Sequence, residues 1–180
     1  MSDQFWLFTG GPGTGKTTTL NMLANAGYPT RPEVARQIIQ DQHAIGGTAH
    51  HQGDRATYLE LQLSHEIGSF RTAAVEAGPV IFDRGLPDVA AYSLIVHEQI
   101  LPHVTEACRR FRSNPTAFVF PPWDAIYALD AERKQDFAEC LETDARCRQG
   151  YTAMGYKLVD VPFGSAKVRA DFISETIKRA

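Results

Sequence analysis

The richest set of chemistry-bearing residues lies near the amino terminus, where residues 10–17 read GGPGTGKT. The run satisfies G-x-x-x-x-G-K-[ST] and lies between an apolar run, residues 5–9, and a helical pattern, which is the context that this phosphate-binding motif requires. Its glycines let backbone N–H groups turn toward a β-phosphate, and the helix amino terminus adds its dipole. Lys16 is expected to bridge the β- and γ-phosphates, and the Thr17 hydroxyl to ligate Mg²⁺. The predicted nucleotide contacts are Gly11, Pro12, Gly13, Thr14, Gly15, Lys16, Thr17 and Thr18.

A second candidate group consists of Asp83 and Arg84, which follow the apolar run Val80-Ile81-Phe82. An acid at the carboxyl end of a strand lies where parallel sheets place their ligands. We therefore expect Asp83 to hold Mg²⁺, directly or through water. Arg84 could grip a phosphate or another substrate anion with its planar guanidinium. The structural alternative for this pair is a helix cap plus a surface salt bridge.

The elements that must position these residues alternate between short apolar runs and longer helical patterns. Such alternation is typical of a parallel sheet covered by helices on both faces. The predicted fold class is α/β, a P-loop NTPase three-layer α/β/α sandwich with a five-stranded parallel sheet, and residues 1–180 are expected to form a single domain. The predicted strands are 5–9, 28–30, 80–82, 117–120 and 158–161. The predicted helices include 16–26, one from Pro32 through Ile39, 54–77, 130–154 and 165–178.

Composition and charge exclude several classes of protein. Of the 180 residues, 43% are hydrophobic and 22% are charged, an ordinary globular mixture. The formal net charge is -3, so no basic excess indicates binding to duplex nucleic acid. The apolar runs are far shorter than the roughly 20 residues of a membrane span, and the first residues lack a basic signal region, which predicts a cytoplasmic location. Cys108, Cys140 and Cys147 lack metal-site spacing and are expected to be reduced core residues.

Four segments carry a resemblance to a known family. The chain resembles the AAA-like predicted ATPase family related to the ribosylnicotinamide kinase domain of NadR, and more widely the nucleoside and nucleotide kinases. Members of that wider group have a phosphate loop, an acid ending strand two, an Asp-Arg or Glu-Arg pair ending strand three, and a lid with an arginine. The matching segments are 9–18, 32–36, 82–88 with Ala91-Tyr92, and 155–159 before Pro162.

Glu33 stands where the resemblance implies the acid that ends strand two. In the kinase group this acid orients the acceptor hydroxyl or takes its proton, and the resemblance implies the same role here. A carboxylate facing the γ-phosphate can indeed hydrogen-bond an attacking hydroxyl. The alternative is a first-turn acid that stabilises its helix dipole. Arg36, one turn later, is expected either to pair with Glu33 or to face the substrate.

Residues 123–135 occupy the position of the lid, between the fourth strand and the long helix. A lid arginine can neutralise charge on the transferring phosphoryl group and exclude water, which makes Arg133 the first candidate. A solvated helical face with pairs between residues four apart is the alternative. Weaker candidates for the same contact are Arg148 and the cluster Arg109, Arg110 and Arg112.

Several other polar and aromatic residues have both a functional and a structural interpretation. Asp88 could hydrogen-bond a substrate hydroxyl or cap the helix that follows the third strand. Tyr58 and Tyr92 could stack on a base or fill the core. The histidines of residues 43–51 lie in a glycine-rich loop without metal-site spacing, so we expect a mobile loop on the substrate side.

These features predict an ATP- and Mg²⁺-dependent kinase that acts on a nucleoside, a nucleotide or a similar small hydroxyl acceptor. The alternative is an ATP- or GTP-hydrolysing regulatory NTPase with a protein or lipid partner. Residues 165–167, SAK, stand where GTPases place a guanine-contacting motif, but no N-K-x-D follows the fourth strand. A nucleotide-binding module without turnover is disfavoured, because Lys16, Thr17 and Asp83 are all present.

Overall fold

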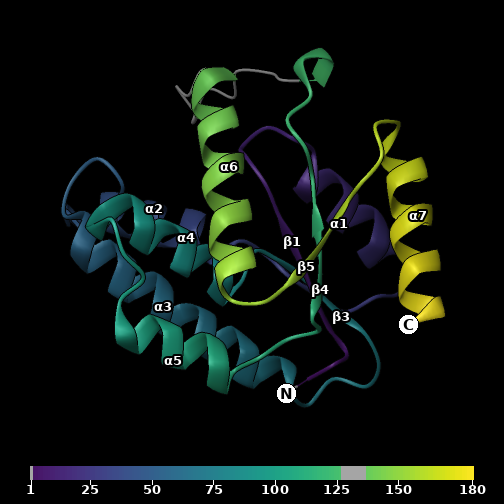
Figure 1. Ribbon diagram of the computed structural model, residues 1–180, viewed down its shortest axis with the longest axis horizontal. Helices are drawn as coiled ribbons and strands as arrows, with labels where there is room; N and C mark the ends of the chain where they lie inside the picture. Colours follow the sequence, from purple (N-terminus) through teal and green to yellow (C-terminus); the bar gives the residue numbers. More distant parts are fainter. Residues whose placement is uncertain (1, 127–136) are drawn as a thin grey trace.

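The computed structural model describes residues 2–126 and 137–180, which build a five-stranded sheet in the order β2-β3-β1-β4-β5 with every neighbouring pair parallel (Figure 1). The strands are β1 Phe5–Thr9, β2 Thr30–Arg31, β3 Val80–Asp83, β4 Thr116–Val119 and β5 Lys157–Asp160. The α-helices are α1 Lys16–Asn25, α2 Val34–Ile45, α3 Arg55–Ala73, α4 Leu86–His97, α5 Pro102–Arg110, α6 Phe137–Ala153 and α7 Ala166–Arg179. The predicted α/β/α sandwich with a five-stranded parallel sheet is confirmed.

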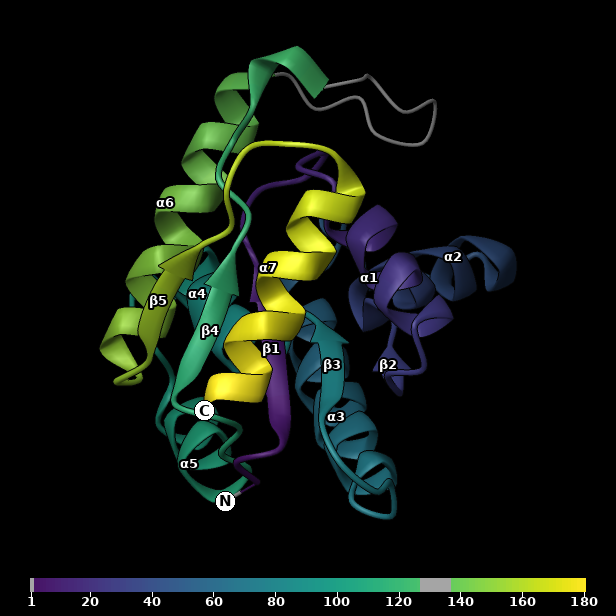
Figure 2. The same cartoon turned by 90° about the vertical axis from the view of Figure 1, so that its right-hand side faces the viewer.

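The two faces of the sheet carry different helices, as the alternation of side chains along β1 makes clear. Trp6 and Phe8 pack with residues of α1 and α7 on one face, whereas Phe5 and Leu7 pack with residues of α3 and α6 on the other. Figure 1 shows α6 and α7 on opposite sides of the sheet, and Figure 2 shows α7 lying across it. Because both faces are covered, every residue of β1 is buried, which explains its continuous apolar sequence.

The register of the strands brings the predicted chemistry to one edge of the sheet. Phe8 on β1 lies level with Asp83 on β3, so the loop after β1 begins beside that carboxylate. Arg31 on β2 lies level with Phe82, which carries Glu33 toward Asp83 and Arg84. The strand order therefore joins three segments that are far apart in the sequence.

The structure corrects several boundaries of the predicted elements. Strand β2 is Thr30–Arg31 rather than 28–30, β4 and β5 each begin one residue earlier than predicted, and α3 ends at Ala73 instead of 77. Two helices, α4 and α5, occupy the connection between β3 and β4. The predicted helix 130–154 is described only from Phe137, while Asp124–Ile126 form a short 3₁₀ turn. Across the described ranges, no helix is both long and apolar enough to cross a membrane.

Candidate functional site

The loop after β1 adopts a phosphate-binding shape around Lys16. This side chain is buried, and its Nζ donates to the carbonyl oxygens of Gly10 at 3.1 Å and Gly11 at 2.6 Å. Burial lowers the pKa of Lys16 from 10.5 to about 8, and the nearby Arg84 adds to this effect. An incoming anion would reverse this effect, so the buried ammonium is prepared for a negatively charged ligand.

Two glycines of this loop are required by close contacts. Gly10 has a φ of +120°, and a Cβ there would lie 2.5 Å from the carbonyl oxygen of Phe120. A Cβ on Gly11 would lie 2.5 Å from the carbonyl oxygen of Cys140 and 2.6 Å from its Sγ. The loop is therefore packed directly against the segment after β4 and against helix α6.

Thr17 and Asp83 form a polar pair beside Lys16. The Thr17 hydroxyl donates to Asp83 Oδ2 at 3.0 Å, while the buried Oδ1 has no hydrogen-bond partner among the described residues. Burial raises the pKa of Asp83, and Lys16 opposes this rise. A hydroxyl, an unpartnered carboxylate oxygen and an adjacent phosphate site suit Mg²⁺, which keeps several waters and takes few protein ligands. In the described ranges, no cluster of three His, Cys, Asp or Glu residues could hold a metal by itself.

Arg84 turns the chain sharply at the end of β3. Its φ of +77° places a non-glycine residue in the left-handed region, at a cost of about 1–3 kcal/mol. Its backbone N–H donates to Phe8 at 2.9 Å, and its guanidinium donates to Glu33 Oε1 and Asp88 Oδ1, each at 3.0 Å. Although burial opposes its ionisation, Glu33 and Asp88 hold the pKa of Arg84 well above its ordinary value. These contacts keep the strained turn in place at the edge that carries the ligand site.

Asp88 is the centre of the contacts that hold Arg84. Its carboxylate accepts hydrogen bonds from the Thr9 hydroxyl at 2.7 Å, the Tyr151 hydroxyl at 2.6 Å and the Gly85 backbone N–H at 3.0 Å. The last of these bonds is the helix cap that the sequence allowed as an alternative. We call Thr9, Glu33, Arg84, Asp88 and Tyr151 the Arg84 network.

Glu33 is the residue that precedes α2, but it makes no side-chain cap for that helix. Its carboxylate instead lies on Arg84, with both side chains largely buried. The helix-dipole interpretation therefore does not account for its direction, and the structure adds an ion pair of Glu33 with Arg84 that the sequence did not predict. The geometry leaves Glu33 at the same sheet edge as Lys16 and Asp83, where it can meet an acceptor hydroxyl.

The predicted lid arginine, Arg133, lies outside the described residues. The weaker candidates are engaged elsewhere: Arg148 pairs with Asp144 and Asp160, and Arg109 pairs with Glu106. Arg112 donates to the carbonyl oxygens of residues 154 and 155, next to β5. Tyr58 and Tyr92 pack edge to face with ring centroids 5.5 Å apart, and the Tyr58 hydroxyl donates to the Ala35 carbonyl.

The sequence analysis missed Arg169, which reaches the phosphate loop from α7. Its guanidinium is buried, donates to the Thr14 carbonyl at 2.6 Å, and lies over the rings of Trp123 and Phe120. Two of its nitrogens, Nε and Nη2, have no partner among the described residues. Trp123 in turn packs on the half-exposed ring of Phe163. The available sequence signal was an arginine on the apolar face of the last helix.

Helix α6 braces both parts of the site. Cys140 Sγ lies 3.1 Å from the Pro12 carbonyl oxygen in the phosphate loop, and Cys147 Sγ contacts Arg84 and Asp88. A Cβ on Gly150 would lie under 3.0 Å from the backbone of Ala91, so α6 and α4 pack almost backbone to backbone. The three cysteines are free and buried, as predicted.

A phosphate loop after β1, an acid ending β3 and a parallel sheet with the order 2-3-1-4-5 together define a P-loop protein with a kinase-like fold. The model of the AAA domain family matches residues 5–169, and the chain belongs to this family. The resemblance stated from the sequence motifs is confirmed. No curated protein matches the sequence significantly.

Solved structures with the same fold include several kinases. NadR in complex with NR is similar with a TM-score of 0.75 and 16% identity over 97% of this chain and 50% of the NadR chain. The chain thus spans half the length of that protein. Deoxyadenosine kinase from M. mycoides has a TM-score of 0.66 and 12% identity, covering 98% of this chain and 100% of its own. Thymidylate kinase from Ehrlichia chaffeensis has a TM-score of 0.60 and 13% identity, covering 99% and 100%.

Proposed function

We propose that this protein is an ATP- and Mg²⁺-dependent small-molecule kinase that transfers the γ-phosphoryl group to a nucleoside, a nucleotide or a similar hydroxyl acceptor. The observation that carries the proposal is the position of Glu33, which Arg84 holds at the sheet edge that also carries Lys16 and Asp83. A hydrolase needs a residue that positions water, whereas a kinase needs one that positions a substrate hydroxyl. A carboxylate fixed by a buried arginine is suited to the second task.

The nucleotide half of the site would use residues that follow the carboxyl ends of several parallel strands at one edge of the sheet. Backbone N–H groups of residues 11–18 and the ammonium of Lys16 would bind the phosphates. Thr17 and Asp83 would hold Mg²⁺, which neutralises phosphate charge when bound. Trp123 and Phe163 offer aromatic faces for the base beside Arg169. Such chemistry implies the cytoplasm, where ATP and Mg²⁺ are available.

The acceptor half would use Glu33 as the group that orients the attacking hydroxyl and receives its proton. With its Oε1 held by Arg84, the carboxylate has a defined direction, so the hydroxyl it binds would be aimed at the γ-phosphate. The strained backbone of Arg84 supports this assignment, because strain of this kind clusters at ligand sites.

The test is the exchange of Glu33 for Gln, together with a screen of ATP consumption across nucleosides, nucleoside monophosphates and cofactor precursors. An acceptor should raise ATP consumption in the wild type, and Glu33→Gln should lower kcat at least about tenfold with little change in ATP affinity, because it removes the proton acceptor while keeping the shape. Glu139→Gln on α6 is a control of the same charge change. Equal transfer rates in the Glu33 variant and the wild type would contradict the role of Glu33.

The alternative, a regulatory NTPase with a protein or lipid partner, has weaker support. The residues SAK at 165–167 have a structural explanation, since the Ser165 hydroxyl caps α7 and Lys167 pairs with Asp171. Strong hydrolysis of ATP or GTP that no small acceptor alters would favour this alternative over the kinase.

A further inference from the structure

The charges around the acceptor side of the site are unusual for a protein that would bind a phosphorylated acceptor. Arg84 is a largely buried cation at this end, close to Lys16 of the phosphate loop, and its Nε and Nη1 groups lie on carboxylates, Glu33 at 3.0 Å and Asp88 at 3.0 Å. Asp83 adds a third carboxylate one residue away. These two carboxylates already balance the charge of Arg84, so the guanidinium offers a phosphate little net attraction.

Helix α3 supplies the facing wall, and its polar residues there are not cations. Tyr58, Gln62 and Glu66 follow one another at four-residue spacing and are 4%, 7% and 6% exposed. The charges of Glu33 and Arg84 act on the pKa of both Tyr58 and Glu66. The side of α3 that carries these two residues therefore faces the Arg84 network. Gln62 lies between them, and its buried Nε2 has no hydrogen-bond partner among the described residues. An unpartnered, buried amide donor points to a ligand group that accepts a hydrogen bond.

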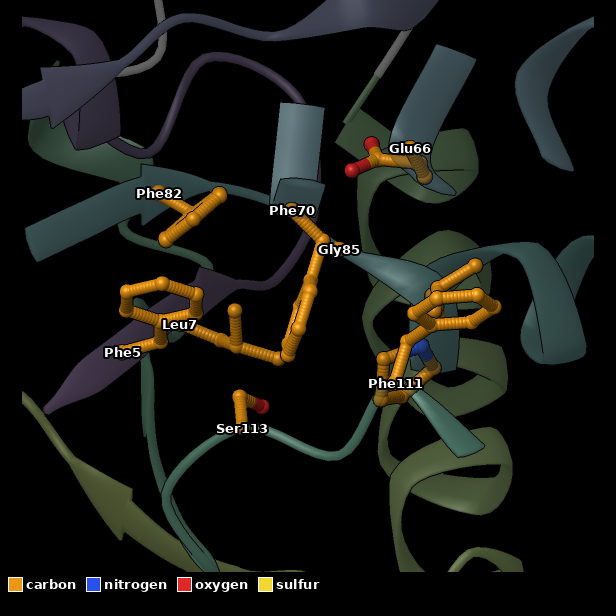
Figure 3. Close-up of a pocket in the computed structure, with 10 residues that line it drawn as sticks. Phe5, Leu7, Glu66, Phe70, Phe82, Gly85, Phe111 and Ser113 are labelled. Atoms are coloured by element: carbon orange, nitrogen blue, oxygen red, sulfur yellow. The ribbon is translucent and has the colours of Figure 1, made fainter. Parts of the chain in front are cut away.

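Glu66 continues this polar, uncationic wall inward. Its carboxyl group lies at the border of a small cavity of about 10 Å³ whose other walls are largely apolar, including Phe70, Phe82 and Phe111 (Figure 3). Burial raises the pKa of Glu66 well above its ordinary value, and Asp88 strengthens the effect. Another negative charge nearby would therefore be resisted, as it is for Glu66 itself.

We propose that the phosphoryl acceptor is an uncharged hydroxyl compound, such as a nucleoside, and that a compound already carrying a phosphate is excluded. The proposal rests on the proposed kinase function and narrows its acceptor. A phosphate brought to Glu33 would meet three carboxylates and a guanidinium whose charge two of them already balance. A neutral hydroxyl keeps both ion pairs of Arg84 intact, and the Gln62 amide can hydrogen-bond an uncharged polar group of the same compound.

Two further cations belong to the helices beside Glu33 and Tyr58, Arg36 on α2 and Arg55 at the start of α3. Arg55 is exposed and lies over the Tyr92 ring, 6.0 Å from its centroid, and Arg36 is half-buried. If either arginine reached into the acceptor site, it could bind a phosphate there. The experiment therefore includes both residues.

The experiment measures kcat/KM for matched pairs, each a nucleoside and its 5′-monophosphate, with saturating ATP and Mg²⁺. Adenosine, guanosine, cytidine, uridine and thymidine supply the uncharged members. We expect an uncharged member to be the acceptor and its monophosphate to be at least about a hundredfold poorer, because the phosphate would disrupt buried ion pairs. Calorimetry with bound ADP should give the same order of affinities.

Two variants test whether the inner face of α3 sets the preference for a nucleoside over its monophosphate. Gln62→Lys adds a cation on the inner face of α3, and Ser64→Lys adds the same charge on its exposed face. The monophosphate-to-nucleoside ratio should rise at least about tenfold in the first and stay unchanged in the second. Because the main measurement uses the wild type, the proposal is tested even if the Gln62 variant does not fold.

The possible outcomes separate this proposal from the kinase function on which it rests. A monophosphate that equals or exceeds its nucleoside would overturn the uncharged-acceptor proposal and leave the kinase function standing. Loss of that monophosphate activity in Arg36→Gln or Arg55→Gln would identify the phosphate-binding cation. If no member of any pair raises ATP consumption above the acceptor-free rate, the kinase function itself is contradicted, and the acceptor proposal falls with it.

Discussion

The phosphate loop and the Arg84 network lie at the same edge of the sheet but are held by different forces. The loop has many local contacts, since Lys16 bonds to two carbonyl oxygens within residues 10–16, and its glycines let it pack closely against Phe120 and Cys140. The Arg84 network is assembled from side chains that stand on β1, β3, α4, α6 and the residue before α2. A loop with many contacts of its own depends less on any one distant side chain, whereas a network of buried charges depends on every member.

This difference has a consequence for function. Under the proposed function, the phosphate loop would bind the part that all nucleoside triphosphates share, for which a general local motif is sufficient. The acceptor side would have to discriminate between compounds, and the groups proposed to do so come from distant parts of the chain. Helix α6 contacts both regions through Cys140 and Cys147, and therefore couples their positions.

The largest effect on stability is expected from Asp88→Ala, which breaks the Arg84 network at its centre. The change leaves Arg84 with one carboxylate and removes the acceptor for the hydroxyls of Thr9 and Tyr151. Removing one partner of a buried pair costs about 3–5 kcal/mol, and we expect the free energy of unfolding to fall by that amount in urea denaturation. Asp171→Ala removes an exposed carboxylate paired with Lys167 and should leave stability nearly unchanged. Similar losses in the two variants would show that the network contributes no special stability.

Lys16→Ala tests the phosphate loop, where the effect should fall on binding or turnover rather than on folding. The substitution deletes a charged contact to the phosphates in a buried site, so ATP affinity or turnover should fall at least about a hundredfold. Because burial already disfavours the charge, the free energy of unfolding should not fall. Lys167→Ala, on the exposed surface of α7, is the matched control. Undiminished ATP affinity together with normal turnover would contradict the assignment of the loop.

The contrast between a contiguous loop and a network of distant side chains also explains which parts of the site could be predicted from the sequence. The phosphate loop was predictable because its residues are contiguous, and Asp83 because it ends an apolar run. Glu33 and Arg84 were identified as candidates, but their pairing was not, since it depends on the register of β2 with β3. The roles of Tyr151 and Arg169 were not predicted, because a polar residue on an apolar helix face does not reveal which partners it meets in the folded chain. The bounds of β2 were predicted wrongly because a strand of only two residues is too short to show a pattern of apolar and polar residues.

Asp83→Asn tests the residue that links the two regions, since Asp83 bonds to Thr17 after the phosphate loop and directly precedes Arg84. The variant keeps the shape and the acceptor oxygen for Thr17 but removes the charge that would face Mg²⁺. Turnover at saturating Mg²⁺ should fall at least about tenfold, while nucleotide binding without metal should change little. Asp160→Asn, at the corresponding end of β5 but largely exposed, should be neutral in both assays. Equal responses of wild type and Asp83→Asn across a Mg²⁺ titration would place the metal elsewhere.

The smallest expected effect is that of Glu66→Gln, and it depends on pH. Glu66 is 6% exposed, and burial raises the pKa of its carboxyl well above the ordinary 4.5. The unfolded chain loses this proton above about pH 4.5, whereas the folded protein keeps it to a higher pH. The contribution of Glu66 to stability is therefore fully present below the unfolded pKa and is lost as the pH rises toward the folded value. Glutamine resembles the protonated carboxyl group and cannot ionise, so the variant should escape this loss.

Glu66→Gln should accordingly raise the free energy of unfolding at pH 8 by on the order of 1 kcal/mol and leave it nearly unchanged at pH 4. Urea denaturation at both pH values gives the comparison, and Glu60→Gln, on the exposed side of the same helix, provides a control that should show no such difference. Parallel stability profiles for wild type and Glu66→Gln would mean that Glu66 ionises normally in the folded protein. The acidic wall of the acceptor site would then carry a full additional charge, which would strengthen the exclusion of phosphate while removing the pH dependence.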